Sequence, residues 1–216
     1  MYQPVQFRED RPEEAHRLIA ERPLGTLVTV GPDGLTADEI PFIVNPTGGP
    51  FGALHGHVAR ANPLWRQASS TPEALVIFHG PEAYVSPTWY PAKAEHHRVV
   101  PTWNYLVVHA HGPLVVHDDV RWIRAQAGRL TRQMEQGRET PWKMADAPRA
   151  YTDEMLEQIV GIEIPIVRLT GKAKLNQNRS EADRIGVVAG LRAAGEPTGE
   201  VADLVERALL EDRARR

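Results

Sequence analysis

The sequence predicts a mainly β fold of the α+β class, in which an antiparallel barrel or sandwich is followed by helices. Before residue 117, apolar strand-like segments follow one another through short turns, without a helix between each pair. From Asp118 onward the apolar residues change to helical spacing. Charge changes at the same point: residues 1–117 carry 8 Lys and Arg and 11 Asp and Glu, whereas 118–216 carry 17 of each. We expect one domain over 1–216, with a barrel-rich part at 1–117 and a helical part at 118–216.

The strands of the first part are predicted from apolar runs bounded by Gly and Pro. Residues 24–30 and 35–44 are expected to form an antiparallel hairpin around the turn at 31–34. A second hairpin is expected within 74–87, around Gly80-Pro81. The remaining expected strands are 52–58 and 99–118, the latter read as a long strand, a Gly-Pro turn and a short return strand.

Helices are predicted from capping residues and apolar stripes. Residues 12–22 begin with proline and an acidic first turn, and Asn62-Pro63 opens a brief helix. A longer helix is expected after Asp118-Asp119. The later expected elements are a helix at about 148–160, a strand at 161–175, a helix after the capping pair Ser180 and Asp183, and a closing helix with a stripe at Val201, Leu204, Val205, Ala208 and Leu209.

Composition excludes several classes of protein. Cysteine is absent, which rules out disulfide scaffolds, thiolate zinc sites and cysteine nucleophiles. The formal net charge of -3 argues against attraction of the whole chain to nucleic acid or anionic membrane. No apolar stretch reaches the length of a membrane span, and the polar N-terminus does not resemble a signal peptide. We therefore expect a cytoplasmic protein that does not enter a membrane.

The central stretch is poor in charge and rich in histidine and aromatic residues. Eight of the nine histidines lie between His55 and His117, together with Trp65, Trp89 and Trp103. Such side chains combine an apolar body with a polar tip, which suits a ligand pocket or a subunit interface. The strand at 99–111 is uncharged on both faces, as expected for a strand covered by a second subunit or a flat ligand, or for an ordinary central strand.

Two His-x-His pairs, His55 with His57 and His109 with His111, have a spacing that can present two imidazoles to one metal ion. A metal-dependent barrel enzyme is therefore a minor alternative. No carboxylate stands at a telling spacing beside either pair, and strand histidines are more often hydrogen-bonded wall residues. We assign no metal ligands.

Two segments suit an anionic ligand. Arg60 stands where a strand gives way to the helix opened by Asn62, and free amides at a helix start together with a guanidinium favour phosphate. Lys172 and Lys174 share a face of the late strand, and Gln177 follows. Both segments are also compatible with solvated loop cations. Rossmann, P-loop and hydrolase-elbow signatures are absent, so a nucleotide would not be held in those ways.

Several ordered motifs resemble the PaiB-type FMN-binding negative transcriptional regulators. They are MYQPVQF at the start, HGHVARANPLW (55–65), FHGPEAYVSPTWYPAK (78–93), VVPTWNY (99–105), IVGIEIPI (159–166) and GKAKLNQN (171–178). The resemblance implies a fold similar to the flavin-binding split barrel of pyridoxamine-phosphate oxidases. That fold is a six-stranded antiparallel barrel, here with appended C-terminal helices, whose homodimer binds FMN at the subunit interface.

The resemblance also implies which residues contact FMN. The phosphate is expected at Arg60, with His57, Asn62 and the backbone of Ala59. The flavin is expected near Thr102, Trp103 and Asn104, with Lys174 and Gln177 closing the site. No catalytic residue is implied.

The family's function would be negative regulation of transcription, with DNA as a partner. Residues 178–216 carry 7 Arg and 8 Asp and Glu, and lack the basic stripe that direct DNA binding normally uses. An FMN-dependent oxidoreductase acting on a small molecule is therefore the main alternative.

Overall fold

The chain forms two compact units, each assembled from segments that are distant in sequence. The computed structural model describes residues 1–32, 34–70 and 73–215. Unit 1 comprises Met1–Arg11, His79–Val108 and Gly171–Arg216, and unit 2 comprises Pro12–Phe78 and His109–Thr170. Strands β6, β7 and β10 contribute residues to both units. The single-domain organisation stays a prediction.

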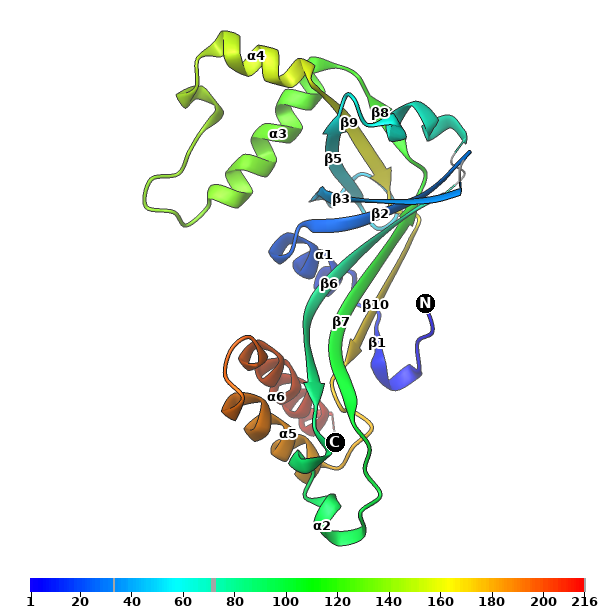
Figure 1. Ribbon diagram of the computed structural model, residues 1–216, viewed down its shortest axis with the longest axis vertical. Helices are drawn as coiled ribbons and strands as arrows, with labels where there is room; N and C mark the ends of the chain where they lie inside the picture. The colour runs from blue at the N-terminus through cyan, green and yellow to red at the C-terminus, as the bar shows by residue number, and fades with distance from the viewer. Residues whose placement is uncertain (33, 71–72, 216) are drawn as a thin grey trace. The chain divides into compact units, whose positions relative to one another are not determined.

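Unit 1 combines four neighbouring strands with two long helices (Figure 1). The strands lie in the order β1, β10, β7, β6, and β1 pairs with β10 in antiparallel register, with Arg8 opposite Lys172. Ser180 caps α5, because its hydroxyl accepts a hydrogen bond from the amide of Asp183 at 3.2 Å. The elements are η1 Val5–Phe7, β1 Arg8–Glu9, β6 Ala74–Val85, η3 Pro87–Trp89, α2 Ala92–His96, β7 Thr102–Gly112, β10 Arg168–Lys174, α5 Glu181–Ala193 and α6 Thr198–Ala214.

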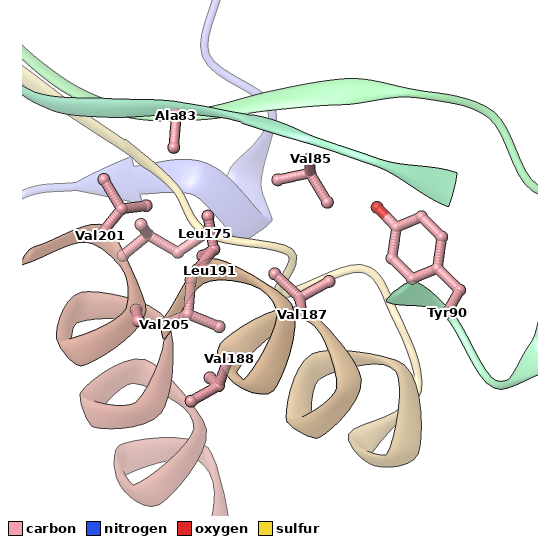
Figure 2. Close-up of a cluster of buried hydrophobic side chains, with 10 residues drawn as sticks. Ala83, Val85, Tyr90, Leu175, Val187, Val188, Leu191, Val201 and Val205 are labelled. Carbon is pink, nitrogen blue, oxygen red and sulfur yellow. The ribbon is translucent and has the colours of Figure 1, made fainter. Parts of the chain in front are cut away.

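The core of unit 1 lies between its strands and the two helices. Figure 2 shows the side chains of this cluster, with Tyr90 beside Val85 and Val187. The predicted stripe of the closing helix is confirmed, since Val201, Val205 and Leu209 are buried. The cluster comprises Ala83, Val85, Tyr90, Leu175, Val187, Val188, Leu191, Val201, Ala202 and Val205.

Unit 2 contains the antiparallel pair of β2 and β3, the start of β6 beside β2, and a second sheet in the order β4, β5, β9, β8. Asp119 caps α3, because its carboxylate accepts hydrogen bonds from the amides of Arg121 and Trp122. The elements are α1 Pro12–Glu21, β2 Leu24–Gly31, β3 Gly34–Pro41, β4 Ile43–Asn45, β5 Ala53–Ala59, η2 Pro63–Ser70, β8 Val115–His117, α3 Val120–Glu135, η4 Met144–Asp146, α4 Arg149–Glu157 and β9 Ile159–Pro165.

The predicted α+β class with antiparallel strands is confirmed, and two expected strands prove to be divided between sheets. The strand expected at 35–44 ends at Pro41, and β4 joins the other sheet. The strand expected at 161–175 splits into β9 and β10. At the break, the amides of Ile166 and Val167 donate to the carbonyls of Gly52 and His111, at 2.8 and 2.9 Å. Because these two amides donate to other segments of unit 2, the chain leaves the sheet of β9 here before it enters the sheet of β10.

The hairpin predicted around Gly80-Pro81 is wrong, because β6 continues through both residues. A residue before proline prefers extended backbone, and proline is tolerated where a strand is irregular. Gly80 and Pro81 are both buried, and here the buried positions change from even to odd numbers. Gly80 and Pro81 therefore change which face of β6 is buried, and the strand continues in the same direction.

Three smaller expectations are also corrected. The short return strand β8 pairs with β9 and not with β7. The helix expected at 148–160 ends at Glu157, because Ile159 already pairs with Ala59 in the sheet. The brief helix after Asn62 is a 3-10 helix. Within the described ranges, no helix is long and apolar enough to cross a membrane.

Candidate functional site

The nine residues expected to contact FMN fall into two sets, one in each unit. The set in unit 2 lies at the end of β5 and just after it, and the set in unit 1 lies on β7, on β10 and in the turn that follows. Each set is brought together within its own unit. The first set is His57, Ala59, Arg60 and Asn62, and the second is Thr102, Trp103, Asn104, Lys174 and Gln177.

The Arg60 guanidinium is engaged by protein groups of unit 2. It makes a bidentate contact with Asp118, at 3.0 and 2.6 Å, and donates to the carbonyls of Glu157 and Ile159, at 2.6 and 3.2 Å. The hydrogen bond from Arg60 lowers the pKa of Asp118 below its ordinary value. Ala59 pairs with Ile159 in the β5–β9 ladder. A phosphate at Arg60 would therefore have to take the position of the Asp118 carboxylate.

The neighbouring polar residues of unit 2 are also paired within the protein. Asn62 acts as the expected cap, because its Oδ1 accepts from the amide of Leu64 at 2.9 Å. Its Nδ2 donates to Asp38 at 2.8 Å. His57 Nδ1 lies 2.8 Å from Oε1 of the buried Gln126. These contacts give the HGHVARAN segment a structural role beside any role in binding.

In unit 1, Lys174 lies at the centre of the second set. Its ammonium donates to the hydroxyl of Thr102 and to the carbonyl of Trp103, the latter at 2.5 Å. Asn104 is fully buried, and its Nδ2 donates to Oδ1 of Asn176 at 2.5 Å. The Oδ1 of Asn104 is buried without a hydrogen-bond partner. An unused buried acceptor of this kind is expected to meet a donor from a ligand or an ordered water.

The turn after β10 is organised by amide side chains. Asn176 has a φ of 62°, in the left-handed region that asparagine tolerates better than most residues. Its Nδ2 donates to the hydroxyl of Tyr90 at 3.0 Å. Gln177 closes the turn, because its Oε1 accepts from the amide of Leu175 and its Nε2 donates to the carbonyl of Ala173. The sequence pointed to this amide-rich loop but not to Asn176 or Tyr90.

Three positively charged side chains lie close together at this turn. Lys172, Lys174 and Arg179 form no ion pair with any residue that the structure describes. The two lysine ammoniums lie 5.4 and 5.9 Å from the ring centre of Tyr105, and the Arg179 guanidinium lies 5.1 Å from that of Tyr90. Burial, then the nearby charges of Lys172 and Arg179, lowers the pKa of Lys174. A bound anion, or a hydrogen-bond acceptor from a ligand, would reduce the repulsion among these cations.

An aromatic surface accompanies these cations in unit 1. The rings of Tyr84 on β6 and Trp103 on β7 lie 6.1 Å apart in an edge-to-face arrangement. Trp103 is 52% exposed and Tyr84 is 47% exposed. A planar heteroaromatic group with carbonyl oxygens, such as a flavin ring, matches a half-exposed indole beside ammonium donors.

Two pockets elsewhere are lined by none of the nine residues. One, of about 500 Å³ in unit 2, is lined by residues that include Arg124, Met144 and Thr152. The other, of about 410 Å³, lies in unit 1 and is lined by residues that include Trp89 and Lys93. The contacts around Lys174 define the candidate flavin site.

Three of the four histidines in the His-x-His pairs, His55, His57 and His111, make side-chain hydrogen bonds. His55 Nδ1 accepts from Arg129 at 2.8 Å, and His111 Nδ1 accepts from Arg168 at 2.9 Å. Glu163 contacts His117 at 2.7 Å and lies 3.7 Å from His55. Among the residues that the structure describes, no group of three or more His, Asp or Glu side chains is placed to hold a metal ion.

We expect His55 to make the stability of the protein depend on pH. Burial lowers the pKa of His55 from its ordinary 6.5, and the charges of Arg129 and His117 lower it further against the opposing effect of Glu163. A lowered pKa in the folded state means that the unfolded chain takes up the proton first as the pH falls. The free energy of unfolding should therefore decrease as the pH falls below 6.5.

Urea unfolding at about pH 7.5 and about pH 5.5 measures this decrease, and the variant His55→Gln should show a smaller one. Part of the decrease should remain in that variant, because burial also lowers the pKa of His111. If the free energy of unfolding falls between the two pH values by the same amount in His55→Gln as in the wild type, His55 does not contribute.

Comparison with known proteins decides the family. The family described as "Putative FMN-binding domain" matches residues 1–168. This chain belongs to that FMN-binding family. It is 30% identical over 207 residues to the protease synthase and sporulation protein PAI 2 of Bacillus subtilis, which covers 95% of this chain and 97% of that protein. The resemblance to PaiB-type proteins is thereby confirmed, and FMN is the cofactor of the family.

Solved structures of flavin proteins share the fold of this FMN-binding family member. The flavocytochrome Anf3 of Azotobacter vinelandii matches with a TM-score of 0.61 at 10% identity, over 83% of this chain and 75% of that one. The FAD and heme binding protein of Mycobacterium smegmatis matches with a TM-score of 0.58 at 18% identity, over 85% and 80%. Lys174 and Gln177 lie beyond the residues that the family match covers.

Proposed function

We propose that this chain is an FMN-binding negative regulator of transcription of the PaiB type, and that the flavin ring is held in unit 1 by Lys174, Thr102, Trp103 and Asn104. The observation that carries the proposal is the group of three cations with no carboxylate partner among the described residues, beside an exposed indole and an unused buried amide oxygen. FMN supplies a redox-active ring when it is bound.

The residues of unit 1 have distinct tasks in this proposal. The Lys174 ammonium, already aimed by the Thr102 hydroxyl and the Trp103 carbonyl, donates to a carbonyl oxygen of the ring. The exposed Trp103 indole provides a flat apolar surface. Gln177 holds the turn after β10 in place through its two local hydrogen bonds. The roles of His57, Ala59, Arg60 and Asn62 at the phosphate stay predictions, because Asp118 would first have to release Arg60.

We propose that the protein acts as a homodimer with FMN at the subunit interface. Support comes from apolar surface that a lone chain would leave in water. Val30 and Leu35 face each other across the β2–β3 hairpin and are 50% and 76% exposed. Such a patch on a sheet edge is typical of an interaction surface. A cytoplasmic location also stays a prediction.

Three arginines of α5 and α6 form ion pairs with carboxylates of the other helix of the pair. Arg184 pairs with Asp212 at 2.6 Å, and Arg192 pairs with Asp203 and Glu206. Arg213 pairs with Glu181. Arginines that are neutralised within the protein contribute little to phosphate neutralisation. We therefore place any contact with DNA outside the α5–α6 pair.

Gene deletion tests the regulatory function. Removing the gene in its host should raise the level of a defined set of transcripts, and the wild-type gene should restore repression. The variant Lys174→Met, which we expect to bind FMN poorly, should fail to restore it at equal protein level. If transcripts do not change and the purified FMN-bound protein oxidises NAD(P)H with a small-molecule acceptor, the oxidoreductase alternative is correct.

A further inference from the structure

A second candidate binding place in unit 1 is the pocket of about 410 Å³ beside η3 and α2. Its lining includes Trp89, Tyr90, Pro91, Lys93 and His97. We propose that this pocket binds a small aromatic carboxylate, and that its occupancy is communicated to the flavin contacts on β7. The binding step stands on the pocket alone, and only the communication rests on the proposed flavin site.

The segment at Trp89, which forms the apolar wall of the pocket, packs closely against α5. A Cβ on Gly190 would lie 2.3 Å from the Trp89 indole, and one on Gly186 would lie 2.2 Å from the Trp89 carbonyl. Two glycines one helical turn apart therefore allow the segment at Trp89 to lie directly on the helix. The amide of Ala92 also donates a hydrogen bond to the carboxylate of Asp183 at 3.1 Å. A wall fixed in this way is preorganised for a flat ligand.

The chemistry of the lining favours an aromatic anion. The indole of Trp89 and the pyrrolidine of Pro91 provide apolar surfaces, and the buried Tyr90 borders the pocket. Lys93 and His97 bring basic groups, and none of the described residues that line the pocket is acidic. Lys93 forms no ion pair with the part of the chain that the structure describes. A carboxylate would give the Lys93 ammonium a partner while an aromatic ring covers the indole.

A chain of side-chain hydrogen bonds links the pocket to the flavin contacts. Tyr90 lines the pocket, and its hydroxyl accepts from Asn176 at 3.0 Å. Asn176 in turn accepts from Asn104 at 2.5 Å, and Asn104 neighbours Trp103 on β7. All of these residues belong to unit 1, and Tyr90, Asn104 and Asn176 are buried. A ligand that contacts Tyr90 therefore acts on the hydrogen bonding of Asn104 through Asn176.

Titration of the FMN-free protein with 2-naphthoate, followed by calorimetry and by saturation-transfer NMR, tests the binding step. We expect saturable binding that Lys93→Met weakens at least tenfold and that Trp89→Leu abolishes. Lys143→Met, which removes an exposed lysine of unit 2, should leave the affinity unchanged. Circular dichroism of each variant checks that it is folded. Absence of binding, equal affinity in Lys93→Met, or displacement of 2-naphthoate by FMN would overturn the proposal of a separate site.

The communication is tested in the FMN-bound protein. Saturating 2-naphthoate should shift the visible absorption of bound FMN, or change its affinity at least threefold. The variant Tyr90→Phe should still bind 2-naphthoate but should lose this effect, because it lacks the hydroxyl that accepts from Asn176. An effect of equal size in Tyr90→Phe would overturn the proposed route. If FMN does not bind at Lys174, 2-naphthoate still binds to the FMN-free protein, so the two failures are distinguishable.

Discussion

Replacing Lys174 with methionine should weaken the binding of FMN and of riboflavin by the same factor, roughly 10- to 100-fold. A hydrogen bond to a charged group contributes about 1.5–3 kcal/mol, and each 1.4 kcal/mol is about tenfold in affinity. The Lys174 ammonium is half-buried, repelled by Lys172 and Arg179, and already directed by Thr102 and Trp103. Because we place it against the flavin ring, the phosphate that distinguishes FMN from riboflavin should not affect the loss. Quenching of flavin fluorescence measures both affinities.

Two further variants serve as a control for this experiment and as a test of the phosphate contact. Lys143→Met removes a lysine in unit 2 and should bind both flavins as the wild type does. If Arg60 holds the phosphate as predicted from the resemblance, Arg60→Ala should weaken FMN and spare riboflavin. If Lys174→Met loses affinity for FMN only, Lys174 contacts the phosphate and not the ring. If it loses affinity for neither flavin, Lys174 is not part of the site.

The substitution Asn104→Asp should lower the free energy of unfolding by about 3–5 kcal/mol at neutral pH. Asn104 is fully buried, and its Nδ2 donates to Oδ1 of Asn176. An aspartate of the same shape replaces that donor with an anionic oxygen facing another acceptor, in a buried position. Chemical denaturation measures the difference. The matched control Asn178→Asp, at an exposed position of the adjacent loop, should change stability by less than about 0.5 kcal/mol.

The loss in Asn104→Asp should depend on pH in a defined direction. Burial raises the pKa of a carboxyl group in the folded state, so protonation favours folding. The difference from the wild type should be greatest at high pH and should shrink as the pH falls toward the ordinary aspartate value of about 3.9. A difference that is small at neutral pH, or that grows in acid, would show that Asn104 is not buried in a hydrogen-bonded network.

The fold was predictable where local chemistry decides it. The antiparallel pairing of β2 with β3, the Asp119 and Ser180 caps and the stripe of α6 lie where the sequence places them. The continuity of β6 was not predictable, because Gly80-Pro81 is a turn signal that pairing with neighbouring strands overrides. The splitting of the strands at Pro41 and at Ile166 likewise depends on pairing between distant segments.

The candidate site was predictable in part for the same reason. Lysine and amide residues close together in sequence pointed to the turn after β10, and Lys174 does contact Thr102 and Trp103 there. The pairing of Arg60 with Asp118 joins residues 58 positions apart and has no local signal. Tyr90 and Asn176 are 86 positions apart, and only the fold places them in contact.

The position of FMN in a crystal structure of its complex with this protein tests the central claim most directly. We predict that a carbonyl oxygen or ring nitrogen of the flavin lies within hydrogen-bond distance of Lys174 Nζ, with the ring against Trp103. A complex in which the flavin ring touches none of Thr102, Trp103, Asn104 and Lys174 would contradict the account.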